Sequence, residues 1–125
     1  MVRAEITHFT TEQYENYKAV KPMMCDLYPH TMKSHSPLPL SPESINRMKS
    51  DPYIKFTDEA LDDFFTIWQN RREYAMGVCL YQKYYCDAGL EQGDIPLEVI
   101  ANRANHLALY ARSINFQQRR WIPNK

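Results

Sequence analysis

Apolar side chains recur at helical spacing in several segments of the chain, and these segments predict most of the secondary structure. The best-marked set keeps the i, i+3, i+4, i+7 spacing of a helix face that packs against a core: Leu61, Phe64, Phe65 and Trp68. Thr57 precedes this set and is a suitable N-cap, and acidic residues fill the first turn, where the helix dipole favours them. We therefore expect a helix after Thr57 whose apolar stripe is buried.

The part of the chain before this helix contains two weaker helical patterns joined by an extended segment. Thr10 or Thr11 is suited to cap a first helix, and Pro22 either kinks that helix or begins a short second one. Four prolines between residues 28 and 42 predict an extended connection. Ser41-Pro42-Glu43 is typical of a helix start, so a short helix is expected from there to about residue 50.

After residue 69 the pattern changes from helical to strand-like and back. A break at Asn70-Arg71 precedes a helical stretch that runs from residue 72 to about residue 81. Tyrosine-rich residues then lead to Gly89, which can adopt the positive φ of a tight turn, so residues 83–95 are expected to form a β-hairpin. Pro96 begins a last helix with these residues on one face: Leu97, Ile100, Ala104, Leu107, Ala111 and Ile114. The order predicts a mostly α fold with a small β-hairpin (α+β), and 125 residues suit a single domain.

The charge is balanced overall and uneven along the chain. The 125 residues include 15 Lys and Arg and 15 Asp and Glu. Residues 1–63 hold seven basic and ten acidic side chains, whereas residues 64–125 hold eight basic and five acidic ones. This asymmetry is consistent with an anionic partner near the C-terminal end, but a solvated helix face followed by a basic tail explains the same charges.

The cysteines and the apolar segments indicate the compartment. Cys25, Cys79 and Cys86 form an odd set without a CxxC pair, which is typical of reduced thiols rather than of a disulfide framework. No apolar stretch approaches the roughly 18 residues that a membrane span needs, and the N-terminal residues lack the apolar core of a secretory signal. We therefore expect a cytoplasmic protein with no membrane partner.

No group of residues has the pattern of a metal or catalytic site. Cys79 and Cys86 lie without a neighbouring histidine, His30 and His35 belong to the proline-rich segment, and His106 is isolated. The helix dipole and solvation explain a set of acidic residues at the predicted helix start: Asp58, Glu59, Asp62 and Asp63. We expect no enzyme activity, no metal and no cofactor.

Aromatic and basic residues together favour a test of nucleic-acid binding. Two tryptophans and nine tyrosines offer faces for base stacking, and Arg71, Arg72 and Lys83 offer cations for phosphates. The aromatic residues with helical spacing are more simply explained as core. Tyr74 is suited equally to a groove or to the core, because it lies beside the predicted break and beside two arginines.

Several local strings, in order, carry a resemblance to a known family. They are Leu27-Tyr28-Pro29-His30, Ser36-Pro37-Leu38, the stretch from Trp68 to Val78 that contains Tyr74, and Lys83–Gly89 followed by Gly93-Asp94-Ile95. In this order the chain resembles the ProQ/FinO family of bacterial RNA chaperones. The resemblance implies an N-terminal extension over residues 1–13, a ProQ/FinO-like domain over residues 14–114 and a basic C-terminal tail over residues 115–125.

The resemblance also implies a function and a site. Members of the family bind structured RNAs, such as a terminator hairpin with a 3′ single-stranded tail, and act in post-transcriptional regulation. The end of the tail enters a pocket at a helix N-terminus, a position that attracts anions. On this chain the pocket would lie at Thr57, with the family tyrosine at Tyr74 and the Pro-Leu segment at Pro37 and Leu38.

The chain departs from the family where the family is basic. Asp58, Asp62 and Thr66 stand where the family commonly has Lys or Arg along its concave helix face, and each lost phosphate contact weakens RNA binding. A basic surface would then be rebuilt from other cations, which are Lys55, Arg71, Arg72, Lys83 and the C-terminal arginines.

Two functional hypotheses follow from the resemblance and these departures. The first is RNA binding without catalysis by a monomer. The second is a repurposed domain that has lost terminator binding and recognises a protein, a basic one in particular, through the Asp58/Asp62 face.

Overall fold

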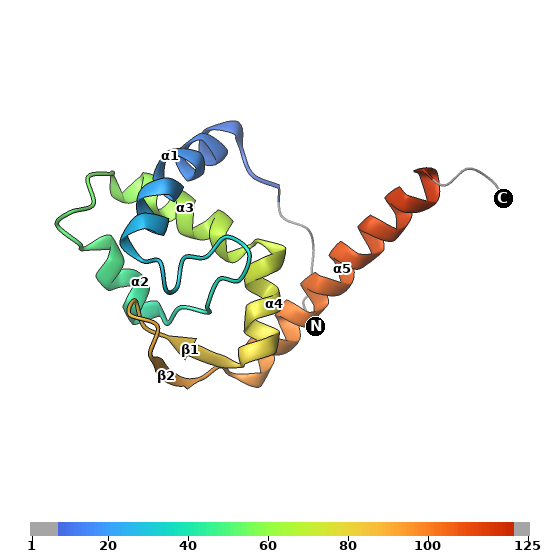
Figure 1. The fold of residues 1–125 in the computed structure, drawn as a ribbon. Helices are drawn as coiled ribbons and strands as arrows, with labels where there is room; N and C mark the ends of the chain where they lie inside the picture. Colours follow the sequence, from blue (N-terminus) through green and yellow to red (C-terminus); the bar gives the residue numbers. More distant parts are fainter. Residues whose placement is uncertain (1–7, 122–125) are drawn as a thin grey trace.

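The chain folds into packed helices with one small antiparallel hairpin at the edge of the helical body (Figure 1). The computed structural model describes the backbone of residues 8–121 and the side chains of residues 8–110. The elements in chain order are α1 (Thr11–Leu27), α2 (Pro42–Lys49), α3 (Asp58–Gln69), α4 (Arg72–Tyr81), β1 (Lys83–Tyr85), β2 (Glu91–Asp94) and α5 (Leu97–Trp121) (Figure 1). The mostly α fold with a small hairpin is therefore confirmed.

The helix starts follow the local sequence signals. Thr10 accepts a hydrogen bond from the Gln13 amide and caps α1, with the Gln13 side chain completing a capping box. Ser41 and Thr57 cap α2 and α3 in the same way, each through its side-chain oxygen. Pro22 lies inside α1, so the first helix continues through this proline and no second helix begins there.

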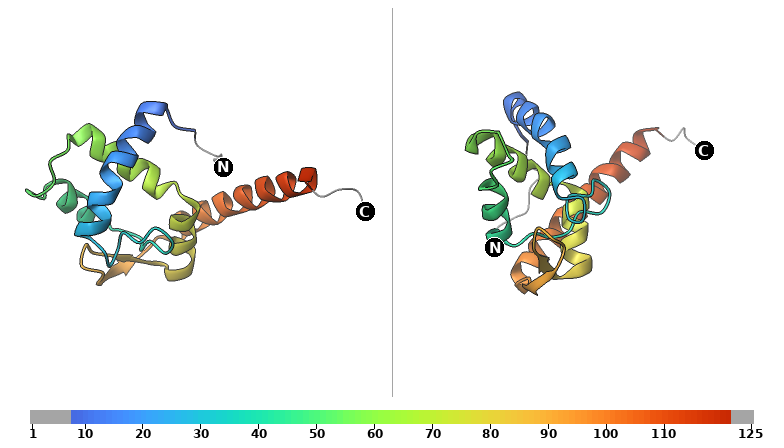
Figure 2. Two further views of the ribbon diagram at one scale, coloured as in Figure 1. Left: turned by 45° about the horizontal axis from the view of Figure 1, so that its top comes forward. Right: turned by 60° about the vertical axis from the view of Figure 1, so that its left-hand side comes forward.

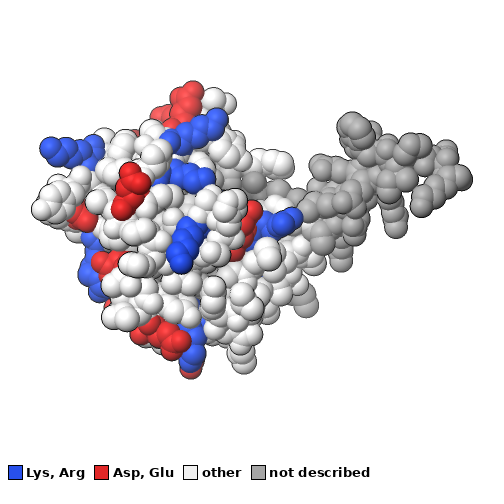
Figure 3. All heavy atoms as spheres, viewed as in Figure 1, with Lys and Arg blue, Asp and Glu red and all other residues white. Residues whose placement is uncertain are grey.

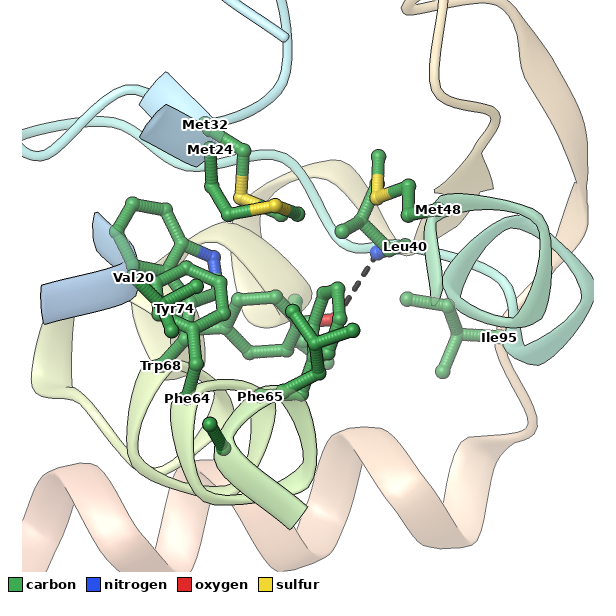
Figure 4. Close-up of a cluster of buried hydrophobic side chains, with 13 residues drawn as sticks. Val20, Met24, Met32, Leu40, Met48, Phe64, Phe65, Trp68, Tyr74 and Ile95 are labelled. Carbon is green, nitrogen blue, oxygen red and sulfur yellow. Dashed lines mark hydrogen bonds between the residues drawn. The ribbon is translucent and has the colours of Figure 1, made fainter. Parts of the chain in front are cut away.

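The core forms where α1 packs along α3 (Figures 1 and 4). Phe64 and Trp68 have no exposed surface, and their rings stack with centroids 5.6 Å apart. Tyr17 of α1 stacks on the other side of Phe64, also at 5.6 Å. The stripe expected after Thr57 is therefore buried as its spacing predicted.

The proline-rich segment pairs with the hairpin. The Tyr85 N–H donates to the Pro39 carbonyl at 2.8 Å, and the Ser41 N–H donates to the Tyr85 carbonyl at 3.2 Å. Residue 40 thus forms a parallel bridge with Tyr85 along the edge of β1 that β2 leaves open. Gly89 has the expected positive φ, 85°, at the turn. The extended proline-rich segment therefore holds the hairpin in place through these backbone hydrogen bonds to β1.

The last helix presents a different face to the fold from the one its sequence predicted. Leu97 is 82% exposed and Ala104 is also exposed, whereas Val99 and Ile100 pack against the core. The physical reason is that α5 packs mainly on α4, which rotates its contact face away from Leu97. Ala111, Ile114 and the side chains of the predicted basic tail lie outside the described residues.

The rest of α5 extends beyond the packed body of the fold (Figures 1 and 2). Tyr110, more than halfway along α5, still contacts that body, because its hydroxyl donates to the Asn70 carbonyl at 2.8 Å.

One close approach ties α4 to the proline-rich segment. A Cβ atom at Gly77 would lie 2.6 Å from the Pro37 carbonyl oxygen, closer than real Cβ contacts allow. Pro37 is itself fully buried. The backbone of α4 can therefore reach this segment only where α4 has no side chain.

Replacing Gly77 tests this contact. Glycine-to-alanine changes inside helices normally stabilise them by about 1 kcal/mol. Gly77→Ala is expected to do the opposite and to lower the free energy of unfolding by about 1–3 kcal/mol, because the obstructing atom is backbone. Urea denaturation measures the change, with Met76→Ala on the exposed side of α4 as the control. An increase in stability for Gly77→Ala would contradict the close approach.

Candidate nucleic-acid interface

Tyr74 joins α4 to the proline-rich segment from inside the fold. Its side chain is 3% exposed, and its hydroxyl oxygen accepts a hydrogen bond from the Leu40 N–H at 2.9 Å (Figure 4). The Gln69 amide also donates to this oxygen, at 3.5 Å. Burial raises the pKa of the Tyr74 phenol. Tyr74 is thus a core residue whose hydroxyl also holds Leu40 and Gln69 in place.

A cavity of about 280 Å³ lies against Tyr74 and is called here the Tyr74 cavity. Its lining combines apolar, amide, aromatic and cationic side chains, among them Leu40, Asn46, Gln69, Tyr84 and Arg103. The Arg103 guanidinium lies 5.7 Å from the centre of the Tyr74 ring. One cation, two amides and an aromatic face therefore converge on a single cavity.

A second, more polar hollow adjoins the Tyr74 cavity. It has a volume of about 470 Å³, and its lining residues are Ser41, Pro42, Glu43, Tyr84 and Gln92. Pro42 and Tyr84 line both spaces. The start of α2 and strand β1 therefore separate two adjoining sites with different chemistry, and the second is called here the Glu43 hollow.

Thr57 lies away from both spaces. It is exposed at the start of α3, whereas Tyr74 contacts Gln69 at the end of the same helix. The 12 residues of α3 rise by about 1.5 Å each, which separates its two ends by roughly 18 Å. The structure therefore does not bring Thr57 and Tyr74 into one cavity, because the length of α3 lies between them.

Of the two neighbouring arginines, one is held inside the fold. The Arg71 guanidinium donates to the Ser34 carbonyl at 2.7 Å, lies over the Trp68 ring at 4.8 Å and pairs with Glu73 at 3.5 Å. Arg71 therefore fixes the proline-rich segment to the corner between α3 and α4. Arg72 is exposed and makes no ion pair with any residue that the structure describes.

Of the two predicted lysines, one is paired with an acid and the other is exposed. Lys83 pairs with Asp94 across the hairpin at 2.6 Å, and this hydrogen bond raises the pKa of Lys83 and lowers that of Asp94. Lys55 is exposed in the loop before α3 and lines neither the Tyr74 cavity nor the Glu43 hollow. The four predicted cations therefore do not gather around one site.

The Pro-Leu segment directly precedes the Leu40 region that Tyr74 contacts, but it does not form part of the cavity wall. Pro37 is buried against Gly77, and Leu38 is half-buried with its N–H donating to the Thr31 carbonyl. Neither residue lines the Tyr74 cavity. Their role in the described structure is to position Leu40.

The acidic stripe on α3 faces solvent. Asp58, Asp62 and Thr66 are exposed, and Asp62 pairs with Lys49 of α2. None of the three lines the Tyr74 cavity or the Glu43 hollow. The stripe is therefore a separate surface, and it does not border the cavity.

Charges of both signs are interspersed over the visible face of the molecule (Figure 3). Several cations have acidic partners, and those near the hairpin are Arg47 with Asp87 and Lys83 with Asp94. Such exposed pairs contribute little to stability, but each acid lowers the positive potential that a phosphate would meet.

Arg103 is the site residue that the sequence reasoning did not select. In the sequence it is only one of several arginines of the C-terminal region. The signal that finds it is its helical spacing from Val99, because position i+4 shares the face that Val99 presents to the cavity. Asn46 follows the same logic on α2, because it lies four residues after Pro42, which also lines the cavity.

Comparisons with known proteins give no match: no family model, no curated protein and no solved structure matches this chain. Among the described residues, no three His, Cys, Asp or Glu side chains gather as a metal site would require. No helix in the described part of the chain is long and apolar enough to cross a membrane.

The hydroxyl of Tyr74 can be tested apart from its ring. Tyr74→Phe keeps the packing and leaves the buried Leu40 N–H without its acceptor, so the free energy of unfolding is expected to fall by about 1–3 kcal/mol. Thermal and urea denaturation measure the loss. Tyr81→Phe is the matched control, because the Tyr81 hydroxyl makes no hydrogen bond with the residues that the structure describes and its ring is partly exposed. Equal stability of both variants would show that the Leu40 contact is not needed.

Proposed function

We propose that this chain is an RNA-binding domain of ProQ/FinO type that acts without catalysis and accepts a 3′ single-stranded end in the Tyr74 cavity. The observation that carries the proposal is the position of Arg103 beside two amide side chains and an aromatic face in one cavity. The proposal moves the tail-binding site from Thr57 to the opposite end of α3. It keeps the structured RNA, such as a terminator hairpin with a 3′ tail, as the ligand.

Each lining group has a role that suits a nucleotide. The Arg103 guanidinium can bind a phosphate, and the Tyr84 ring offers a stacking face for a base. The amides of Asn46 and Gln69 carry both donors and acceptors and can bind base edges or ribose hydroxyls. A post-transcriptional role of this kind fits the cytoplasmic location expected from the cysteines.

The paired charges predict how the RNA is held. Lys83 and Arg47 already have acidic partners, so a long track of phosphate contacts is not supported. Binding should then depend on the tail end more than on the stem, and its affinity should fall less steeply with salt than for a protein with many phosphate contacts.

The competing proposal is recognition of a basic protein through α3. It is favoured by the exposure of Asp58 and Asp62 on one face of that helix, where Asp62 also pairs with Lys49. This surface and the Tyr74 cavity are separate, so variants of one leave the other intact.

The test is fluorescence anisotropy with a terminator hairpin that carries a 3′ oligo-U tail, compared with the same hairpin whose tail is blocked, at two salt concentrations. We expect binding that needs the unblocked tail. Equal affinity for both hairpins would contradict a tail-binding cavity, and no binding at low salt would leave the protein-recognition proposal.

A substitution of Arg103 tests whether the RNA binds at the Tyr74 cavity. Arg103→Gln is expected to weaken hairpin binding about tenfold, the usual size of one lost charge-assisted contact. Arg72→Gln is the matched control, since Arg72 is exposed and lines neither the Tyr74 cavity nor the Glu43 hollow. A larger loss for Arg72→Gln than for Arg103→Gln would place the RNA at the start of α4 instead.

A further inference from the structure

The Glu43 hollow is built around the side-chain amide of Gln92, whose oxygen faces two serine hydroxyls. The Ser41 hydroxyl lies 2.7 Å from Gln92 Oε1, and the Ser44 hydroxyl lies 3.2 Å from the same oxygen. The two serine hydroxyls are also hydrogen-bonded to each other at 2.7 Å, while Ser41 Oγ accepts from the Ser44 N–H and Ser44 Oγ accepts from Arg47. One hydroxyl hydrogen is therefore used between the serines, and the other is donated to Gln92 Oε1.

The consequence is a donor on the other side of the amide. Gln92 Nε2 donates to no residue that the structure describes, while Gln92 itself lines the hollow. Glu43 lines the same hollow and makes no ion pair with the described residues. The hollow thus combines an N–H₂ donor, a carboxylate acceptor and the ring of Tyr84.

These groups suit some ligands and oppose others. A phosphate would be repelled by the carboxylate, and an ammonium or guanidinium group would leave the Gln92 donor without an acceptor. A nucleobase edge offers donors and acceptors side by side, and its face can stack on the Tyr84 ring. The volume of about 470 Å³ falls in the usual range of small-ligand sites, roughly 300–1,000 Å³.

Among the bases, guanine matches the pair of groups most fully. Its N1–H and N2–H₂ can both donate to one carboxylate, and its O6 can accept from an amide beside them. Adenine and cytosine place only one donor group on that edge, and uracil places an acceptor on each side of its single N–H.

We propose that the Glu43 hollow binds a guanine base, with the Glu43 carboxylate accepting from N1–H and N2–H₂ and Gln92 Nε2 donating to O6. The source of the base is either a single-stranded guanine of a bound RNA or a free guanine nucleotide. The RNA source rests on the proposed function, whereas the free-nucleotide source does not.

The first experiment uses mononucleotides and the full chain. GMP, AMP, CMP and UMP are titrated separately while the side-chain amide signal of Gln92 is followed by NMR. We expect GMP to bind about tenfold more tightly than the other three, the discrimination expected of one good bidentate pair. Equal affinities for the four nucleotides would overturn the proposal, as would stronger displacement of GMP by arginine amide than by AMP.

Two single-residue variants separate a loss of guanine recognition from a loss of folding. Glu43→Gln is expected to remove the preference for GMP, because a neutral amide cannot accept both donors as the carboxylate does. Glu98→Gln is the matched control, since Glu98 is an exposed acid in the first turn of α5 and lines neither described space. Retained GMP preference in Glu43→Gln, with both variants folded by circular dichroism, would overturn the assignment.

An experiment with short RNAs distinguishes the guanine proposal from the proposed RNA-binding function. Single-stranded hexanucleotides of uracil are compared with hexanucleotides in which one uracil is replaced by guanine or by adenine. Preference for the guanine form that depends on Glu43 supports an RNA source. GMP selectivity without any RNA binding would overturn the proposed RNA function and support the free-nucleotide source, whereas RNA binding without guanine selectivity would overturn only the guanine proposal.

Discussion

The hydrogen bond from the Leu40 N–H to the Tyr74 hydroxyl is the contact on which the arrangement around the candidate site depends. It joins the end of the proline-rich segment to α4, and the adjacent residues of that segment pair with β1. The same tyrosine ring lines the cavity and lies beneath Arg103. Because an unpaired N–H buried at this point would be costly, the segment, the hairpin and the cavity wall are fixed together.

Neutral charge and an RNA-binding role are compatible if recognition is local. The cations near the hairpin are paired with acids, and Arg71 is occupied with the backbone of Ser34 and the Trp68 ring. Binding by a broad basic surface is therefore not what this fold offers. A small cavity with one cation and several hydrogen-bonding groups can still bind a chain end, because the affinity then comes from enclosed contacts rather than from long-range attraction.

Local sequence signals predicted much of the fold. The caps at Ser41 and Thr57, the buried stripe of α3 and the turn at Gly89 each depend on neighbours only a few residues away. The continuous passage of α1 through Pro22 was left open, since a local pattern cannot weigh a proline against the packing of the whole helix.

The candidate site was less predictable because it depends on contacts between distant residues. Tyr74 was among the predicted residues, but its hydrogen-bond partner at Leu40 is 34 positions away, and no local spacing in the sequence indicates that contact. The pairing of Lys83 with Asp94 likewise follows from the hairpin register rather than from composition. Arg103 was missed because the face of α5 that packs is set by α4, not by the apolar pattern of α5 alone.

The most direct test of this account is to map a bound 3′ tail on the protein by NMR, using a short oligo-U RNA with an unblocked end. The account predicts that the largest chemical-shift changes fall on the side-chain amides of Asn46 and Gln69 and on the backbone of Tyr84. Changes confined to Asp58, Asp62 and Thr66 on the exposed face of α3 would contradict it, because that surface lies apart from the Tyr74 cavity.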